Sequence, residues 1–219
     1  MSVIARGVLA ALVVLAAPTS ALRAQSETPG NWRWATDRPA QLVTGQDVPD
    51  SGWRFVAMPP GWHITMGPGG VLYDPAHTAT GRYVLEAETF LFPEKTDQGF
   101  GLFVGGRNLD GKPEYVAFVI RHDGHGAVMR VGPSPAMLVA WTPGDSVTAQ
   151  AASDAVRNVL RVTVERDSVF FTVNGGRVAT LPRSAGGFDG QFGFRVGAGA
   201  NLHISTLDYT QRIAPPRRR

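Results

Sequence analysis

The sequence predicts an all-β protein, a sandwich of two antiparallel sheets. Four runs between residues 160 and 209 alternate apolar and polar residues, as a strand with one buried and one solvated face does. Three turn signals separate the runs, and one of them, Asn174-Gly175, is the strongest short signal for a tight hairpin. The 26 glycines and 16 prolines fit many short strands joined by tight turns. We find no heptad and no internal repeat, and the pattern allows at most one helical turn, within residues 149–156.

The alternation assigns the strands in order along the chain. The longest early strand covers residues 82–92, with Leu85 and Ala87 on one face and Glu86 and Glu88 on the other. Turn residues separate this strand from its neighbours, as they separate the other predicted strands. Strands are expected at residues 53–58, 62–66, 71–73, 82–92, 100–105, 115–121, 127–131, 137–141, 160–165, 169–173, 177–181, 191–196 and 202–205.

The chain divides into four parts. Residues 1–24 predict a signal peptide, or an N-terminal anchor if they are not cleaved, because Arg6 precedes a short apolar run and Ala21 and Ala24 suit cleavage. The apolar run is well short of the ~20 residues of a spanning helix. We therefore expect an exported bacterial protein, periplasmic or on the cell surface, which contacts a membrane only through an uncleaved N-terminal segment. The other parts are an extended strap at 25–51, a β-sandwich domain at 52–211 and a basic tail at 212–219.

Charge and cysteine content exclude several classes of function. The formal net charge is +3, but without Arg6 and Arg23 of the leader and the three arginines at 217–219, 16 basic residues remain against 18 acidic ones. A body so close to neutral offers no basic face for nucleic acid. The chain has no cysteine, which removes disulfides, thiolate metal sites and cysteine nucleophiles.

Two stretches resemble a known family. The order LRVTVERDSVFFTVNGGRVATL followed by DGQFGFRVGAGANLHISTLDY resembles the closing half of a concanavalin A-like (laminin G-like) jelly roll. The stretch GFGLFVGGRNLDGKPEYVAFVIRHDGHGAVMRV is similar to secreted bacterial 3-keto-disaccharide hydrolase-like domains. The resemblance covers roughly residues 53–210. It implies a jelly-roll sandwich, with calcium near a sheet rim in some members and glycosides as substrates in others.

Glu86 and Glu88 are the first candidates for catalysis. Two carboxylates at positions i and i+2 of a strand point the same way and can share a cleft. Retaining glycosidases hold two carboxylates ~5 Å apart, so that one protonates the leaving oxygen while the other attacks. The glucanase pattern Glu-x-Asp-x-x-Glu has a third acid that is missing here. A solvated sheet face is therefore the favoured interpretation, with catalysis as the alternative.

Two loops carry residue types that bind metal ions. His122, Asp123 and His125 combine imidazole and carboxylate groups, which suit a divalent ion, but the same residues form turn dipeptides. Asn108 and Asp110 resemble part of a calcium loop without its closing acid. We predict no cofactor, and keep calcium as the alternative.

Aromatic residues beside turns are the better indication of a ligand. Trp62, Tyr73 and Trp141 could offer an apolar plate to the C–H face of a sugar, although packing explains them as well. Arg121, Arg195 and His203 fall on the polar sides of their strands and could line a concave face with the two glutamates. The predicted ligand-binding residues are Trp62, Tyr73, Glu86, Glu88, Arg121, Trp141, Arg195 and His203.

These observations predict a non-catalytic binding or interaction module for a glycan or a partner protein. A nucleophile elbow, a Walker loop and a His-Glu-x-x-His motif are all missing from the sequence. One alternative is a glycoside hydrolase of the 3-keto-disaccharide hydrolase-like type, with Glu86, Glu88 and His203 as its catalytic candidates. Another is an accessory subunit of a cell-envelope membrane complex.

Overall fold

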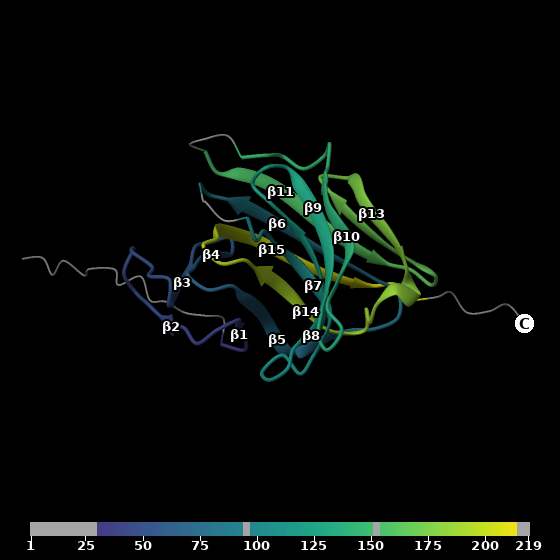
Figure 1. Ribbon diagram of the computed structural model, residues 1–219, viewed down its shortest axis with the longest axis horizontal. Coiled ribbons are helices and arrows are strands. Elements are labelled where there is room, and N and C mark those ends of the chain that lie inside the picture. The colour runs from purple at the N-terminus through teal and green to yellow at the C-terminus, as the bar shows by residue number, and fades with distance from the viewer. Residues whose placement is uncertain (1–29, 94–96, 151–153, 214–219) are drawn as a thin grey trace, which may run out of the picture.

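The computed structural model describes residues 30–93, 97–150 and 154–213, and their strands form two stacked sheets (Figure 1). Sheet A contains, in spatial order, β1 (Arg33–Thr36), β5 (Gly70–Ala79), β14 (Gly190–Val196), β7 (Phe100–Arg107), β8 (Glu114–Ile120), β9 (His125–Val131) and β10 (Ala136–Pro143). Sheet B contains β13 (Gly176–Pro182), β12 (Ser168–Val173), β11 (Val156–Val164), β6 (Tyr83–Leu91), β15 (Asn201–Gln211), β4 (Trp62–Met66), β3 (Gly52–Ala57) and β2 (Gln41–Leu42). Neighbouring strands are antiparallel except β2 and β3. The predicted all-β sandwich is confirmed.

The described residues hold only one helical turn, the 3-10 turn Arg183–Ala185 after β13. None of their helices is long and apolar enough to cross a membrane. The predicted signal peptide or anchor, the first residues of the strap and the end of the basic tail lie outside the described residues. The middle of the segment 149–156, where the sequence allows one helical turn, also lies outside the described residues. The last residue of that segment, Val156, begins β11.

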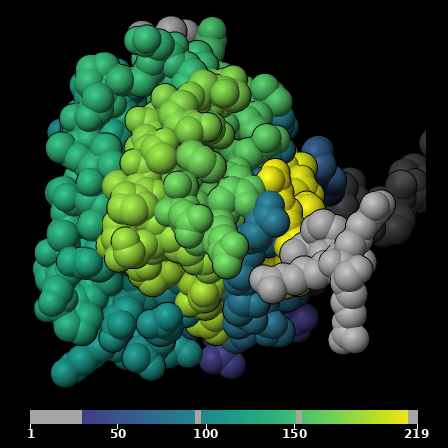
Figure 2. All heavy atoms as spheres, turned by 90° about the vertical axis from the view of Figure 1, so that its right-hand side faces the viewer, coloured from purple at the N-terminus to yellow at the C-terminus, as the bar shows by residue number. Residues whose placement is uncertain are grey.

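The core lies between the sheets and is built from alternate residues of each strand. In β11, Leu160, Val162 and Val164 are fully buried, as the alternation predicted. Phe118 of sheet A and Phe171 of sheet B meet across this layer, with their ring centroids 5.3 Å apart. Figure 2 shows the flank where the green residues of β11 to β13 lie beside the teal strands of sheet A.

The hairpin between β12 and β13 has the predicted tight turn. Asn174 has φ 49° and Gly175 has φ 83°, so both central residues take the left-handed conformation that such a turn requires. Glycine and asparagine adopt this conformation more easily than other residues. The turn fixes the register in which Val173 pairs with Gly176.

Strand β5 is longer than the predicted residues 71–73, because an irregularity accommodates its proline. The pairing with β14 shifts between Gln191 and Gly193, so that the β5 residues from Asp74 to His77 bulge out of the ladder. Pro75 lies in this bulge, where its missing N–H removes no ladder hydrogen bond. Asp74-Pro75 therefore looks like a strand end in the sequence although the strand continues.

Sheet A also carries a second apolar cluster on its outer face. Phe103, Tyr115 and Val119 alternate with core residues along β7 and β8 and are almost fully buried. Strap residues add β1 to the edge of sheet A and β2 to the edge of sheet B. Trp34 of β1 packs against Trp53 of β3, with ring centroids 5.0 Å apart, so β1 is held by a residue of the other sheet.

Candidate functional site

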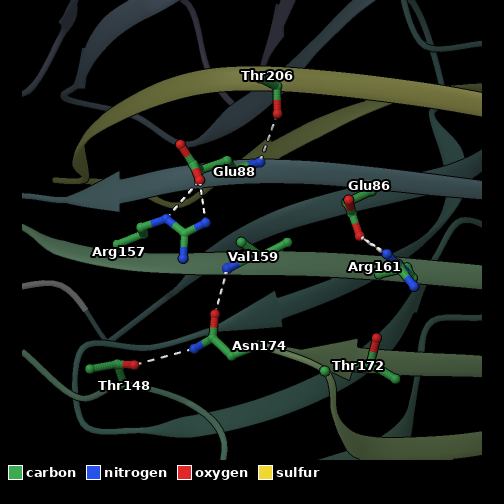
Figure 3. Close-up of a pocket in the computed structure, with 10 residues that line it drawn as sticks. Glu86, Glu88, Thr148, Arg157, Val159, Arg161, Thr172, Asn174 and Thr206 are labelled. Atoms are coloured by element: carbon green, nitrogen blue, oxygen red, sulfur yellow. Dashed lines mark hydrogen bonds and ion pairs between the residues drawn. The ribbon is translucent and has the colours of Figure 1, made fainter.

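A groove of about 690 Å³ lies on the outer face of sheet B, over β6, β11 and β12 (Figure 3). We call it the sheet B groove. Two of the predicted site residues, Glu86 and Glu88 of β6, lie together in this groove. Its lining consists of Glu86, Glu88, Thr148, Arg157, Val159, Arg161, Thr172, Asn174, Gly175 and Thr206.

Strand alternation places the two glutamates in this groove. Leu85 and Ala87 are fully buried in the core, so the side chains between and after them point outward. β11 lies beside β6 and presents Arg157 and Arg161 on the same face. Charged side chains of opposite sign thus meet across the two strands.

Each glutamate forms an ion pair with one arginine. The Nε atom of Arg161 donates to Oε2 of Glu86 at 2.5 Å, and its second contact to the same oxygen comes from a terminal nitrogen. The Nε and Nη2 atoms of Arg157 contact Oε2 of Glu88 at 2.6 and 2.5 Å. In both glutamates, Oε1 accepts no hydrogen bond from the described residues. The groove therefore keeps two oriented carboxylate oxygens as acceptors.

The hairpin supplies a rigid rim on the other side. The Oδ1 atom of Asn174 accepts a hydrogen bond from the backbone N–H of Val159 at 2.8 Å. Its Nδ2 atom donates to Ser146 O at 2.9 Å, to Thr148 Oγ1 at 3.2 Å and to Asn158 Oδ1 at 2.9 Å. These bonds tie the turn, β11 and the preceding loop together.

The lining is polar but electrically balanced. The negative charges of two carboxylates and the positive charges of two guanidiniums cancel, and threonines 148, 172 and 206 add hydroxyl groups. Such a surface has no net charge with which to attract an ion, yet it presents donors and acceptors side by side. Hydroxyl groups, which both donate and accept, match this arrangement.

The two glutamates have the same kind of ion pair, which bears on the catalytic alternative, although the neighbour on β15 is Asp208 for Glu86 and Thr206 for Glu88. A glycosidase gives its two acids different environments, so that one carries the proton and the other attacks. Glu86 and Glu88 are each held by an arginine in the same way and are similarly exposed. His203, the third catalytic candidate, does not line the groove, and its Nε2 atom contacts Pro60 O at 3.0 Å.

The expected convergence of Arg195 with the glutamates is not found. Arg195 lies on β14 of sheet A and forms a two-pronged ion pair with Asp37. Tyr73 lies on the neighbouring strand β5, opposite Gly193, with its hydroxyl donating to Asp110 at 2.6 Å. Alternation shows which residues of one strand share a face, but it does not show which sheet the strand joins.

The remaining predicted ligand residues are dispersed. The guanidinium carbon of Arg121 lies 4.5 Å from the ring centroid of Trp141, at one end of sheet A. Trp62 packs on the core of the sandwich, 5.8 Å from Trp32 between ring centroids. None of these three predicted residues lines the sheet B groove.

The two predicted metal loops hold turns and ion pairs. Asp123 accepts hydrogen bonds from Arg121 and from the backbone of His125, and Asp110 is bound by Tyr73 and Arg33. Within the described parts of the chain, no three residues of the kinds His, Asp or Glu are grouped so that they could hold a metal ion. Neither His122 nor Asn108 joins such a group.

Sequence reasoning missed the basic half of the groove. Arg157 and Arg161 alternate with the buried residues of β11 in the same way as the glutamates do on β6. This shared alternation was available as a signal. It could not show that β11 pairs with β6, which brings residue 161 opposite residue 86.

Two histidines lie farther along the same face. His63 of β4 and His203 of β15 are directly paired across the strands, and the His63 Nε2 atom lies 2.8 Å from Asn201 Oδ1. Burial lowers the pKa of His63 below its ordinary value, and the positive charges of His203 and Arg54 lower it further. A hydrogen bond to Asn201 opposes this shift.

We expect acid to destabilise the protein through His63. Because its pKa is lower in the folded chain, the unfolded chain takes up the proton first, and the free energy of unfolding falls as the pH drops below the ordinary value of 6.5. The loss levels off below the folded pKa. Urea unfolding between pH 7.5 and pH 5 should therefore show a shallower pH dependence for His63→Gln than for the wild type. Equal slopes in the two proteins would contradict this assignment.

Comparison with protein-family models gives no match, and neither does comparison with curated protein sequences. Among solved structures, the carbohydrate-binding module CBM66 from Bacillus subtilis is similar, with 12% identity, a TM-score of 0.55, and coverage of 79% of this chain and 100% of the module. An endo-1,3-β-glucanase from Streptomyces sioyaensis has 11% identity and a TM-score of 0.56, over 84% of this chain and 90% of the enzyme. A Bacillus licheniformis β-glucanase has 12% identity and a TM-score of 0.55, over 87% of this chain and 96% of the enzyme. These similarities show the concanavalin A-like jelly-roll fold, and at such identities they show the fold alone.

Proposed function

We propose that this protein binds a neutral glycan without cleaving it, and that the sheet B groove is the binding site. The observation that carries the proposal is the pair of ion-paired glutamates, each with one oxygen left as an acceptor beside a guanidinium donor. Neighbouring hydroxyls of a sugar ring can donate to the carboxylate and accept from the arginine. A charged glycan would instead compete with one partner of each pair.

The comparisons support this class of ligand. One similar structure is a carbohydrate-binding module and others are β-glucanases, so the fold accommodates glycans in proteins of both kinds. Fold alone does not decide function, because one sandwich hosts many activities. We favour binding over hydrolysis because an arginine holds each glutamate in the same way and to a similar exposure. If the first 24 residues act as a secretory signal, the ligand would be a glycan of the cell envelope or the surroundings.

Calorimetric titration with neutral β-glucans, other neutral polysaccharides and a uronic acid polysaccharide tests the proposal. We expect a neutral glycan to bind, and the double variant Glu86→Gln/Glu88→Gln to bind it at least about tenfold more weakly, since hydrogen bonds to charged groups contribute about 1.5–3 kcal/mol. The variant should fold normally, because exposed ion pairs contribute about 0–1 kcal/mol to stability. Glu165→Gln is the control, since Glu165 pairs with Arg82 and Arg212 outside the groove.

Other outcomes would redirect the assignment. Release of reducing sugar that is lost in Glu86→Gln would establish the hydrolase alternative. Unchanged affinity in the double variant would remove the groove as the site. If no glycan binds and a protein partner is recovered from the envelope, the accessory-subunit alternative takes its place.

A further inference from the structure

A second hollow, of about 410 Å³, lies on the outer face of sheet A. We call it the sheet A hollow. Residues 34–37 of the strap form one wall, and the loop at residues 109–113 forms the other. Val71 and Tyr115, which belong to the outer apolar cluster of sheet A, line it between these walls.

Asp37 stands at the strap side and is held in a fixed orientation. Arg195 donates from Nη1 to Asp37 Oδ1 at 2.6 Å and from Nη2 to Oδ2 at 2.5 Å. The arginine side chain is only 15% exposed, whereas that of Asp37 is 47% exposed. A buried guanidinium therefore presents an accessible carboxylate, and the two-pronged geometry restricts its rotation.

Asp110 stands on the loop side with a similar support. Its Oδ1 atom accepts from the Tyr73 hydroxyl at 2.6 Å, and its Oδ2 atom contacts Arg33 at 3.2 Å. Tyr73 is almost fully buried, while the Asp110 side chain is 62% exposed. The loop carboxylate is thus also anchored from beneath and open to the hollow.

The hollow shares the charge balance of the sheet B groove, but each of its four carboxylate oxygens already accepts a hydrogen bond from the protein and would receive a ligand hydroxyl at its second lone pair. Two carboxylates, each paired with one arginine, border it, so their charges cancel. The sheet A hollow differs in its apolar lining, which comes from Val71, Leu109 and Tyr115. An apolar surface beside oriented carboxylates suits a sugar ring, which has a C–H face and hydroxyls at its edge.

We propose that the sheet A hollow is a second binding site for the same neutral glycan class, so that one chain holds two glycan segments at once. The inference rests on the proposed function of the sheet B groove. The two sites lie on the outer faces of different sheets, with the core between them. A short oligosaccharide would fill each site separately. Long polysaccharide molecules would be cross-linked, because one protein chain could hold segments of two of them.

Calorimetry with a short neutral oligosaccharide of the bound type measures the number of sites. We expect two sites per wild-type chain and one in Asp110→Asn. Gly111→Phe is the second variant, because Gly111 lines the hollow and a Cβ atom there meets only Asn108 O, at 3.9 Å, so that a large side chain can be added at its border without a clash at the Cβ. It should also leave one site, as should Glu86→Gln/Glu88→Gln. Mixing with the long polysaccharide should give turbidity with the wild type and little with any of these variants, provided that light scattering shows a monomer.

The outcomes separate this inference from the proposed function. One site in the wild type, lost only in the glutamate variant, would overturn the second site and leave the groove assignment intact. One site lost only in Asp110→Asn and Gly111→Phe would overturn the groove assignment and the two-site model together. Absence of binding to every neutral oligosaccharide would overturn both.

Discussion

Replacing Phe171 with alanine is expected to lower the free energy of unfolding by about 3–5 kcal/mol. Phe171 is fully buried and contacts the ring of Phe118 across the two sheets. Its removal takes away apolar area and leaves a cavity in the layer that joins the sheets. Chemical denaturation followed by tryptophan fluorescence measures the change.

The neighbouring residue provides a matched control. Phe170 is next along β12 and points to the outer face, where Arg177 lies 4.2 Å from its ring centroid. Phe170→Ala should cost about 1 kcal/mol, the value of an exposed contact between a cation and an aromatic ring. Equal losses for the two variants would mean that β12 does not alternate between core and surface.

The second large effect is expected at the hairpin. Asn174→Ala should lower the free energy of unfolding by about 3 kcal/mol, because alanine is strained at φ 49° and makes none of the side-chain bonds of asparagine. Asn174→Gly relieves the strain, so its free energy of unfolding should fall by only about 1–2 kcal/mol, which is the contribution of the lost hydrogen bonds. Both variants should also weaken glycan binding, since Asn174 forms the rim of the sheet B groove.

Asn108 separates conformational strain from hydrogen bonding. It has φ 52°, and its side chain makes no hydrogen bond within the described residues. Asn108→Ala should therefore lower the free energy of unfolding only through backbone strain, by about 1–2 kcal/mol. A loss at Asn108 as large as that at Asn174 would show that the side-chain bonds of Asn174 contribute nothing measurable.

Local patterns account for what could be predicted from the sequence. The period of two predicted that Glu86 and Glu88 share an outer face, and the Asn174-Gly175 dipeptide predicted the hairpin beside them. Both features depend only on residues close in the chain. The groove nevertheless has a second half that no local pattern specifies.

Long-range pairing accounts for what could not be predicted. Arg161 becomes the partner of Glu86 only because β11 pairs with β6 in one register, across 75 residues of sequence. Arg195 was grouped with the glutamates because its strand alternates in the same way, but β14 joins sheet A. Asp37 had no pattern to mark it, since its role depends on β1 of the strap pairing with β5 at the edge of that sheet.

A titration of the ¹⁵N-labelled protein with a neutral oligosaccharide, followed by NMR, tests whether the sheet B groove binds glycan. We expect the amide signals of Glu88, Val159, Asn174 and Thr206, which surround the sheet B groove, to shift in a saturable way. If these signals stay fixed while the oligosaccharide binds, or if no neutral oligosaccharide shifts any signal, the outer face of sheet B is not a glycan-binding surface.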